Sequence, residues 1–197
     1  MKRILIFAIL TLSLGGCAVK PLAYFVVEPY AKPFDNKINK TLYITFKDDV
    51  KDSFVVSGEG VKKMQVTQYR SSLQEAFKKT FEKNFANVQF TEKKSDSALT
   101  LVIFRVKPFW KIVSTHSTYN GYSKTSTTTT DISVINQFES SLYFQGQKLI
   151  AADDESASDG TAAYIGSMPR IFEDGTRVMC ELINKSIFTD AVVQKIK

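Results

Sequence analysis

Residues 98–106 read ALTLVIFRV, a run in which nearly every side chain is apolar. A strand that is apolar at consecutive positions is covered on both of its faces, as in the middle of a sheet. Arg105 is the exception, and its long side chain can extend outward near the end of the strand. The run therefore predicts the central strand of a sheet.

The segment after this run predicts a long neighbouring strand. From residue 132 to residue 144 apolar residues alternate with polar ones, and Thr127–Thr130 extends the strand because threonine has a high β-propensity. Asn120-Gly121 lies ahead of it and is a hairpin turn signal. We expect one strand from about residue 126 to residue 144.

A second hairpin follows at once. Gln145-Gly146-Gln147 predicts a turn into a strand over residues 148–152, which makes this the clearest hairpin of the sequence. Residues 151–160, AADDESASDG, are acidic and small, and we expect them to form a loop.

Two amphipathic helices are expected. Residues 66–85 carry an aromatic and apolar stripe at four-residue spacing, with lysines on the other face. Residues 168–189 carry a second stripe, with Ser167 as cap and Pro169 in the first turn. Gly175 weakens that second helix by about 1 kcal/mol.

Shorter β-signals complete the pattern. Residues 42–46, LYITF, predict a first strand, and residues 87–91 predict another. Residues 54–56 form a short apolar run before the turn signal at 57–60, and this run can pair with the first strand as a hairpin.

These elements predict a single α+β domain over residues 41–197. The expected architecture is a single mixed, mostly antiparallel sheet with two helices packed on one face. The first helix is expected to be a right-handed crossover between parallel strands.

The N-terminus has the layout of a secretory signal over residues 1–16. Lys2 and Arg3 precede an apolar stretch from residue 4 to residue 14, which is shorter than the roughly 20 residues that a membrane-spanning helix needs. Leu14, Gly15 and Gly16 form the signal-cleavage region directly before Cys17.

Leu14-Gly15-Gly16-Cys17 resembles the lipobox of bacterial lipoproteins. The resemblance implies that Cys17 becomes the first residue of the mature protein and carries covalent diacylglyceryl and N-acyl groups. Two or three acyl chains make a stable membrane anchor. With Ala18 after the cysteine, the family rule implies an outer-membrane location facing the periplasm.

Residues 17–40 contain Pro21, Pro29 and Pro33 and are expected to be a lipidated, extended tether that lifts the domain off the membrane. Its aromatic residues either pack on the domain or contact a partner or headgroups. If Cys17 is lipidated, Cys180 has no disulfide partner and is expected to be a buried structural thiol.

Composition excludes several classes of protein. The chain has 197 residues, 44% hydrophobic and 23% charged, which is ordinary globular composition. The net charge of +6 falls to about +4 without Lys2 and Arg3, too little to imply nucleic acid. A single histidine excludes a multi-histidine metal site, and we expect no metal and no cofactor.

Two groups of residues are candidates for a catalytic site, although the sequence contains no nucleophile elbow and no nucleotide-binding fingerprint. His116 lies among serines and threonines, and Asp153–Asp159 is the densest acidic cluster, which is a candidate for Ca²⁺ or for paired carboxylates. His116 is expected to be an exposed or hairpin-packed histidine, and the acidic cluster is expected to be a solvated loop. Lysines near the first helix are either ordinary solubilising charge or a face for anionic lipid headgroups or lipopolysaccharide phosphates.

The lipobox, the proline-bearing segment and the order of elements resemble small bacterial envelope lipoproteins. This largely uncharacterised group includes the lipopolysaccharide-export plug and auxiliary lipoproteins of ABC-type transport systems. The resemblance implies a non-enzymatic, membrane-anchored accessory or assembly subunit of an envelope complex.

A partner-binding hairpin is expected at Thr118, Tyr119, Asn120, Gly121 and Tyr122. An unpaired strand edge there can accept a partner strand. The alternative function is binding of periplasmic lipid or lipopolysaccharide in a groove between helices and sheet.

Overall fold

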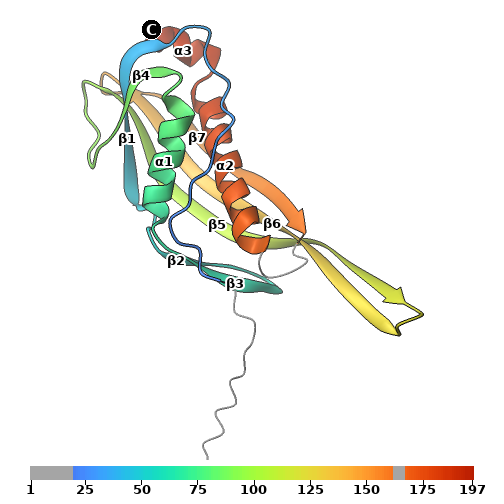
Figure 1. Ribbon diagram of the computed structural model, residues 1–197. Coiled ribbons are helices and arrows are strands. Elements are labelled where there is room, and N and C mark those ends of the chain that lie inside the picture. Colours follow the sequence, from blue (N-terminus) through green and yellow to red (C-terminus); the bar gives the residue numbers. More distant parts are fainter. Residues whose placement is uncertain (1–19, 162–166) are drawn as a thin grey trace, which may run out of the picture.

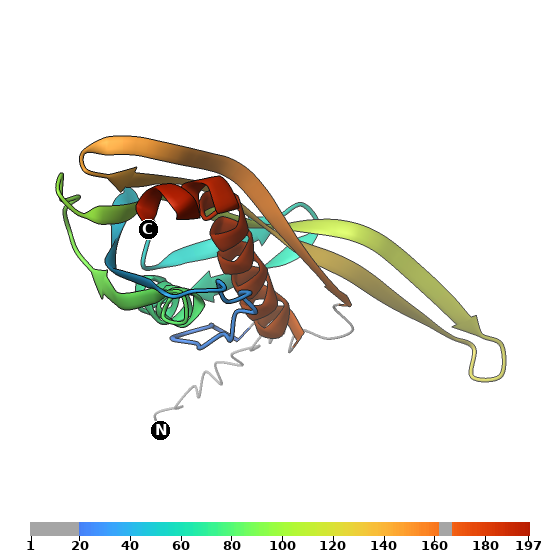
Figure 2. The ribbon, with the colours of Figure 1, turned by 90° about the horizontal axis from the view of Figure 1, so that it is seen from above.

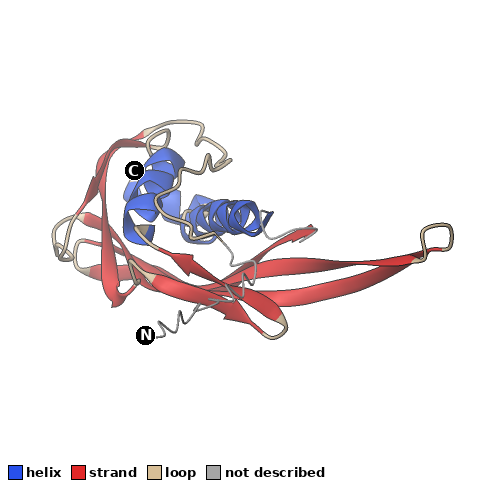
Figure 3. Ribbon diagram, turned by 60° about the horizontal axis from the view of Figure 1, so that its bottom comes forward, coloured by secondary structure: helices blue, strands red, loops and turns tan. Residues whose placement is uncertain are grey.

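The computed structural model describes residues 20–161 and 167–197. A curved five-stranded sheet wraps around helices that all lie on one of its faces (Figure 3). The strands in spatial order are β4 (Phe85–Phe90), β1 (Ile38–Asp49), β5 (Leu99–Asn120), β6 (Thr125–Phe144) and β7 (Gln147–Thr161). The pairs β4–β1 and β1–β5 are parallel, and the pairs β5–β6 and β6–β7 are antiparallel.

The predicted central strand is confirmed. β5 lies in the middle of the sheet, and Leu99–Ile103 is buried along its whole length. The strand continues far beyond the apolar run, to Asn120, so Arg105 lies within it rather than near its end. The guanidinium of Arg105 lies 3.4 Å from Oδ1 of Asp153 on β7.

The two predicted helices are confirmed with shorter bounds. α1 (Tyr69–Phe81) buries its aromatic stripe. It is shorter than the predicted range 66–85 at both ends, because Val66 belongs to the strand before it and Phe85 belongs to β4. α2 (Met168–Ile187) packs beside α1, and its N-cap is Ser167. The sequence did not predict α3 (Asp190–Ile196), a short helix that begins after Thr189. The strands β1 and β4 that flank α1 are parallel, as expected of a crossover.

The expectation of a single sheet is wrong. β2 (Phe54–Gly58) pairs with β3 (Val61–Val66), and the two form a separate two-stranded sheet. The run at 54–56 therefore pairs with the strand that follows it and not with β1. The reason is local: the turn at Glu59-Gly60 brings β3 back directly, and Val56, Met64 and Val66 enter the core.

The expectation of an acidic loop over residues 151–160 is also wrong. These residues belong to β7, which pairs with β6 from Phe144↔Gln147 to Asp131↔Thr161. β7 is an edge strand; its carboxylates are exposed, while Ala152 and Ser156 are buried. Pairing with a long partner strand outweighs the low β-propensity of Asp, Ser and Gly.

The proline-bearing segment lies across the helices. We call residues 20–37 the strap; in Figure 1 it is the blue chain that runs in front of α1 and α2. Leu22 joins the edge of β3 through two backbone hydrogen bonds, from its N–H to Gln65 O (2.9 Å) and from Thr67 N–H to its carbonyl (3.0 Å). Phe25 is buried against the rings of Tyr69 and Phe172.

Candidate functional site

One hairpin extends out of the domain and is the most exposed part of the described chain. We call residues 113–130 the arm; Figures 1 and 2 show it as a two-stranded ribbon that extends away from the helices. Pairing between β1 and β5 ends at Asp49↔Arg105, and pairing between β6 and β7 ends at Asp131↔Thr161. Within residues 20–161 and 167–197, the two strands of the arm therefore pair only with each other.

This arrangement gives the arm two open strand edges. The register runs without interruption from Thr115↔Thr130 to Asn120↔Thr125, so the ribbon is regular out to its tip. A regular strand edge presents a row of backbone N–H and C=O groups that a further strand can pair with. The arm can therefore accept an additional strand without any rearrangement of the domain.

The side chains of the arm are polar, small and nearly uncharged. Serine and threonine dominate, and the ionisable side chains besides tyrosine are His116 and Lys124. Large apolar surface is concentrated at the base, where Val113 is exposed, and at the tip, where Tyr119 and Tyr122 are exposed. Exposed tyrosines are typical of protein-binding surfaces because they bury a large area at low entropic cost.

The tip of the arm lies at the residues that the sequence predicted for the hairpin. Thr118, Tyr119 and Asn120 end β5, and Gly121 and Tyr122 begin the turn of residues 121–124. Oδ1 of Asn120 accepts hydrogen bonds from the N–H groups of Tyr122 (3.0 Å) and Ser123 (3.4 Å). Asn120 therefore closes the turn with its side chain, as asparagine does in Asx turns.

His116 does not form a catalytic triad with its neighbours. Nε2 of His116 lies 3.0 Å from Oγ of Ser114 and 3.3 Å from Oδ2 of Asp131, while Ser114 Oγ donates directly to the same Oδ2 (2.6 Å). A triad needs the carboxylate on the ring nitrogen opposite to the one that faces the hydroxyl. Here serine and carboxylate share one ring nitrogen, on an exposed ribbon without a cleft.

The acidic cluster is spread along β7. Successive side chains of a strand point to opposite faces of the sheet. Asp153, Glu155 and Asp159 therefore lie on one face of β7 and Asp154 lies on the other. Within the part of the chain that the structure describes, no group of three or more His, Cys, Asp or Glu side chains is placed to hold a metal ion. None of the helices described is long and apolar enough to cross a bilayer.

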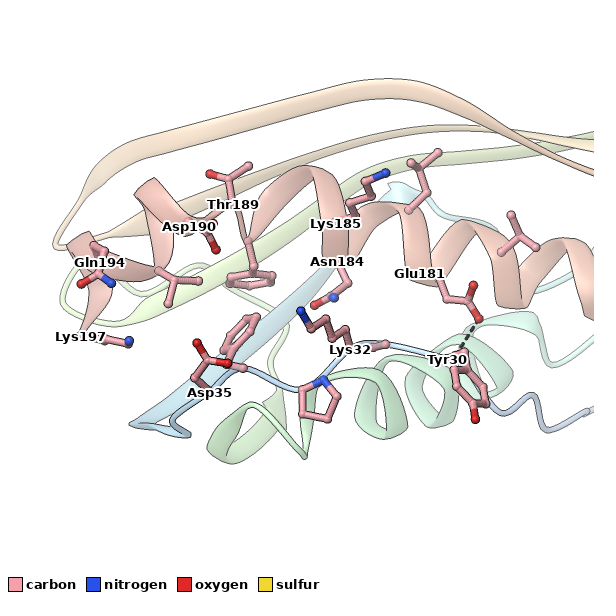
Figure 4. Close-up of a pocket in the computed structure, with 17 residues that line it drawn as sticks. Tyr30, Lys32, Asp35, Glu181, Asn184, Lys185, Thr189, Asp190, Gln194 and Lys197 are labelled. Carbon is pink, nitrogen blue, oxygen red and sulfur yellow. Dashed lines mark hydrogen bonds between the residues drawn. The ribbon is translucent and has the colours of Figure 1, made fainter.

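An open cavity of about 1040 Å³ lies between the strap and the C-terminal half of α2 with α3 (Figure 4). Tyr30 N–H donates to Oε1 of Glu181 (2.6 Å) at one end of it. The apolar part of its lining is formed by Phe34, Val178, Leu182, Phe188 and Val193. The charged part is formed by Lys32, Asp35, Glu181, Lys185, Asp190 and Lys197.

This cavity is not the groove that the sequence suggested. The space between helices and sheet is filled by large buried side chains, including Trp110, Phe138 and Phe172. The cavity lies on the other side of α2, where the strap leaves the helices. The sequence does not reveal this cavity, because the cavity depends on where the strap docks; the one signal in the sequence is the aromatic Phe34 after Pro33.

The predicted lipidation residue Cys17 and the predicted signal-cleavage residues Leu14, Gly15 and Gly16 lie outside the described residues. The other cysteine, Cys180, is buried on α2 as expected, and burial raises the pKa of its thiol well above the usual range. A buried thiol with a raised pKa is a poor nucleophile.

Several solved structures are similar to this chain at low sequence identity. One is a Xanthomonas campestris protein described by the family model DUF330. It is 11% identical in sequence to this chain, with a TM-score of 0.48, and the match covers 83% of this chain and 91% of that protein. The rare lipoprotein B from Shewanella oneidensis is 11% identical, with a TM-score of 0.39 over 79% and 92%. An uncharacterized lipoprotein B from Nitrosomonas europaea is 11% identical, with a TM-score of 0.45 over 84% and 96%. No family model matches the sequence, and no curated protein matches it significantly.

Proposed function

We propose that this protein is a lipid-anchored bacterial envelope lipoprotein that binds another envelope protein through the arm. The observation that carries the proposal is the open edge on each side of a regular ribbon that extends beyond the domain. The protein acts as a non-catalytic accessory or assembly subunit. Its anchor is the acylated Cys17, in the outer membrane and facing the periplasm.

Strand addition is the binding mode that suits the arm. Main-chain hydrogen bonds supply affinity when an extended segment pairs with an open edge, and side chains on alternate positions supply specificity. The ribbon is nearly free of charge, so a partner strand does not have to desolvate ionised groups along most of its length. Tyr119 and Tyr122 at the tip add aromatic contact area.

The test is in-cell cross-linking and purification of the tagged, lipidated protein beside three variants. Deletion of residues 117–127 shortens the arm, Tyr119→Ala with Tyr122→Ala removes the aromatic tip, and Cys17→Ser removes the anchor. We expect one dominant partner that the deletion abolishes, that the tyrosine variant weakens, and that the Cys17 variant loses from the membrane fraction.

The matched control is Tyr30→Ala, which removes another exposed tyrosine far from the arm. Circular dichroism and thermal unfolding of each variant check that the domain remains folded. Unchanged partner recovery with the shortened arm would refute the binding assignment, and Cys17 free of acyl groups by mass spectrometry would refute the anchor.

A second candidate function is binding of a lipid or lipopolysaccharide acyl chain in the cavity beside α2. The cavity volume of about 1040 Å³ is at the upper end of the usual range for small-molecule sites. Its lining combines apolar side chains with three lysines and three acidic residues, and Oδ1 of Asn184 in this lining is buried without a hydrogen-bond partner among the described residues. An amphiphile with a polar headgroup fits this combination.

Mass spectrometry of organic extracts from purified Cys17→Ser protein tests the second candidate. We expect co-purified lipid, and we expect Leu182→Glu to remove it because the charge lies in the apolar lining. Leu149→Glu on β7, where the side chain is also half-buried, is the matched control. Protein free of lipid, or equal lipid in both variants, would exclude the cavity as the binding site.

A further inference from the structure

The attachment of the strap limits which end of the domain can face the membrane. Leu22 is held on β3 by two backbone hydrogen bonds and is buried. It lies five positions after Cys17 in the sequence. A chain spans at most about 3.3–3.6 Å per residue, so an acylated Cys17 keeps Leu22 within roughly 17 Å of the bilayer surface.

We infer that the β2–β3 hairpin is a membrane-facing surface that contacts the headgroups of anionic phospholipids. The inference rests on the anchor in the proposed function. In Figure 1 this hairpin and the start of the strap lie at one end of the molecule, while α3 and the C-terminus lie at the other end. The bilayer is therefore on the side of β2 and β3.

The charge of the hairpin suits that placement. β2 and β3 together carry Lys62 and Lys63 and no acidic residue, and the acid between the strands is Glu59 at the turn. Lys20, exposed at the start of the strap, adds a third lysine beside β3. Lysines close to an anionic membrane surface are attracted to it, and each contributes about five-fold to membrane affinity.

Of the acids near the start of β2, Asp48 and Asp49 end β1, and Asp52 lies on the connection between β1 and β2. Asp52 is engaged there, because its Oδ1 accepts the N–H of Arg70 (3.0 Å). Asp48 and Asp49 are accompanied by Lys47 and Lys51 in the same stretch of sequence. The lysines of β3 thus add positive charge to a strand pair that carries no carboxylate of its own.

An apolar side chain is also exposed on the β2–β3 hairpin. Val55 points away from the core on β2, and half of its side chain is exposed. At the turn, a Cβ on Gly60 would lie 2.9 Å from Cδ1 of Ile112, so the turn rests against the base of the arm. Valine and isoleucine flanked by lysines form the combination that binds at a headgroup boundary. The arm then leaves the domain close to the membrane, within reach of a membrane-embedded partner.

Fluorescence quenching on vesicles tests this orientation. The lipidated protein is inserted into vesicles of phosphatidylcholine with or without phosphatidylglycerol, each with a headgroup-linked quencher. One sample carries a dye at Ser57→Cys on β2 and another at Gln194→Cys on α3; both positions are exposed, and the buried Cys180 does not compete for the dye. We expect strong quenching at position 57 and little at position 194.

Charge reversal decides whether the lysines cause the contact. Lys62→Glu with Lys63→Glu is expected to lower the ratio of docked to undocked protein by at least thirty-fold on phosphatidylglycerol vesicles. Lys83→Glu directly after α1 with Lys195→Glu on α3 makes the same change in net charge at the opposite end, outside the cavity, and is expected to leave quenching at position 57 unchanged. Salt at 1 M should remove the difference between the two vesicle types.

Equal quenching at both labels, or equal loss in both charge variants, would overturn the inference. If the protein fails to associate with vesicles because Cys17 is not acylated, the anchor in the proposed function fails instead. A synthetic diacyl maleimide coupled to Cys17 then supplies the anchor, with the dye attached to an azide-bearing amino acid at position 57 or 194 instead of a cysteine, and the same comparison of labels decides the orientation. A surface shielded by a protein rather than by lipid would show no dependence on phosphatidylglycerol.

Discussion

Gly175 of α2 lies directly against Val134 of β6: a Cβ placed on Gly175 would lie 2.1 Å from Cγ1 of Val134. It would also lie 3.2 Å from Nδ2 of Asn136. The glycine therefore allows a close approach of the helix to β6, and the apparent weakness of this helix in the sequence has a packing reason.

Gly175→Ala is expected to destabilise the protein by about 1–2 kcal/mol. Glycine to alanine in a helix interior ordinarily stabilises by about 0.5–1 kcal/mol, but here the added methyl overpacks the interface, which costs about 1–3 kcal/mol. Urea unfolding measures the change in free energy. Gly121→Ala in the exposed turn of the arm, where a Cβ meets nothing within 4 Å, is the control and should be nearly neutral.

A companion substitution separates overpacking from other causes. Val134→Ala alone creates a cavity and destabilises. Combined with Gly175→Ala, it makes room for the new methyl, so the double variant should be more stable than the sum of the two single effects predicts. Strict additivity would show that the contact between Gly175 and Val134 is not what limits the helix position.

The sequence predicted those elements whose pattern is local. The aromatic stripe of α1, the apolar run of β5 and the alternation along β6 each carry their periodicity in a short window. β7 was missed because AADDESASDG has no apolar alternation; it is a strand because β6 offers it a long ladder to pair with.

The arm was predicted only in part. Asn120-Gly121 located its tip, but nothing in residues 107–119 shows that β5 continues past the end of β1. The open edges exist because neighbouring strands stop, and the end points of other strands are not encoded in the arm itself. The cavity beside α2 could not be predicted for the same reason, because its wall is the docked strap.

The strap should be an integral part of the folded domain. Phe25 packs against Tyr69 and Phe172, and its N–H donates to Oγ of Ser72 (3.0 Å). Phe25→Ala is expected to lower the free energy of unfolding by about 3–5 kcal/mol, as for a buried phenylalanine in a core. Tyr30→Ala, which changes a strap side chain that is almost fully exposed, should have little effect on the unfolding midpoint in urea.

If Phe25→Ala were as mild as Tyr30→Ala, the strap would be a surface segment that leaves the core unaffected. Limited proteolysis gives an independent measurement. The chain around residues 20–30 should resist cleavage in the unaltered protein and become sensitive in Phe25→Ala, because the released strap exposes its backbone.

The carboxylates of β7 should protect an open sheet edge. Asp153, Glu155 and Asp159 are exposed on this edge strand, and charge on an edge disfavours pairing with another chain. Replacing all three by threonine is expected to leave the protein folded but to promote self-association, measured by light scattering and sedimentation at increasing concentration. Replacing Asp35, Asp96 and Asp190, which are exposed outside strands, by the same residue is the control with an equal change in charge. Equal association in both triple variants would attribute the effect to net charge instead.

Alkaline pH should weaken the fold through Cys180. Burial raises the pKa of the Cys180 thiol, and also that of the Tyr69 hydroxyl, so both stay protonated in the folded protein at pH values where the unfolded chain releases their protons. The unfolded chain then binds fewer protons than the folded one. The contribution of the thiol to the free energy of unfolding is therefore constant below its unfolded pKa of about 8.5 and falls above it, by up to about 1.4 kcal/mol per pH unit. The hydroxyl of Tyr69 adds a second fall of the same slope above the unfolded tyrosine's pKa of about 10.

Cys180→Ala isolates the thiol from the other groups that titrate in this range. At pH 7 the variant should be less stable than the unaltered protein, because it leaves a small cavity in the core. Between pH 7 and pH 10 that difference should shrink by about 2 kcal/mol, since the variant has no thiol to ionise on unfolding. Urea unfolding of both proteins, in a Cys17→Ser background, measures the two free energies at each pH. A difference that stays constant to pH 10 would show that Cys180 ionises in the folded protein, which contradicts its burial on α2.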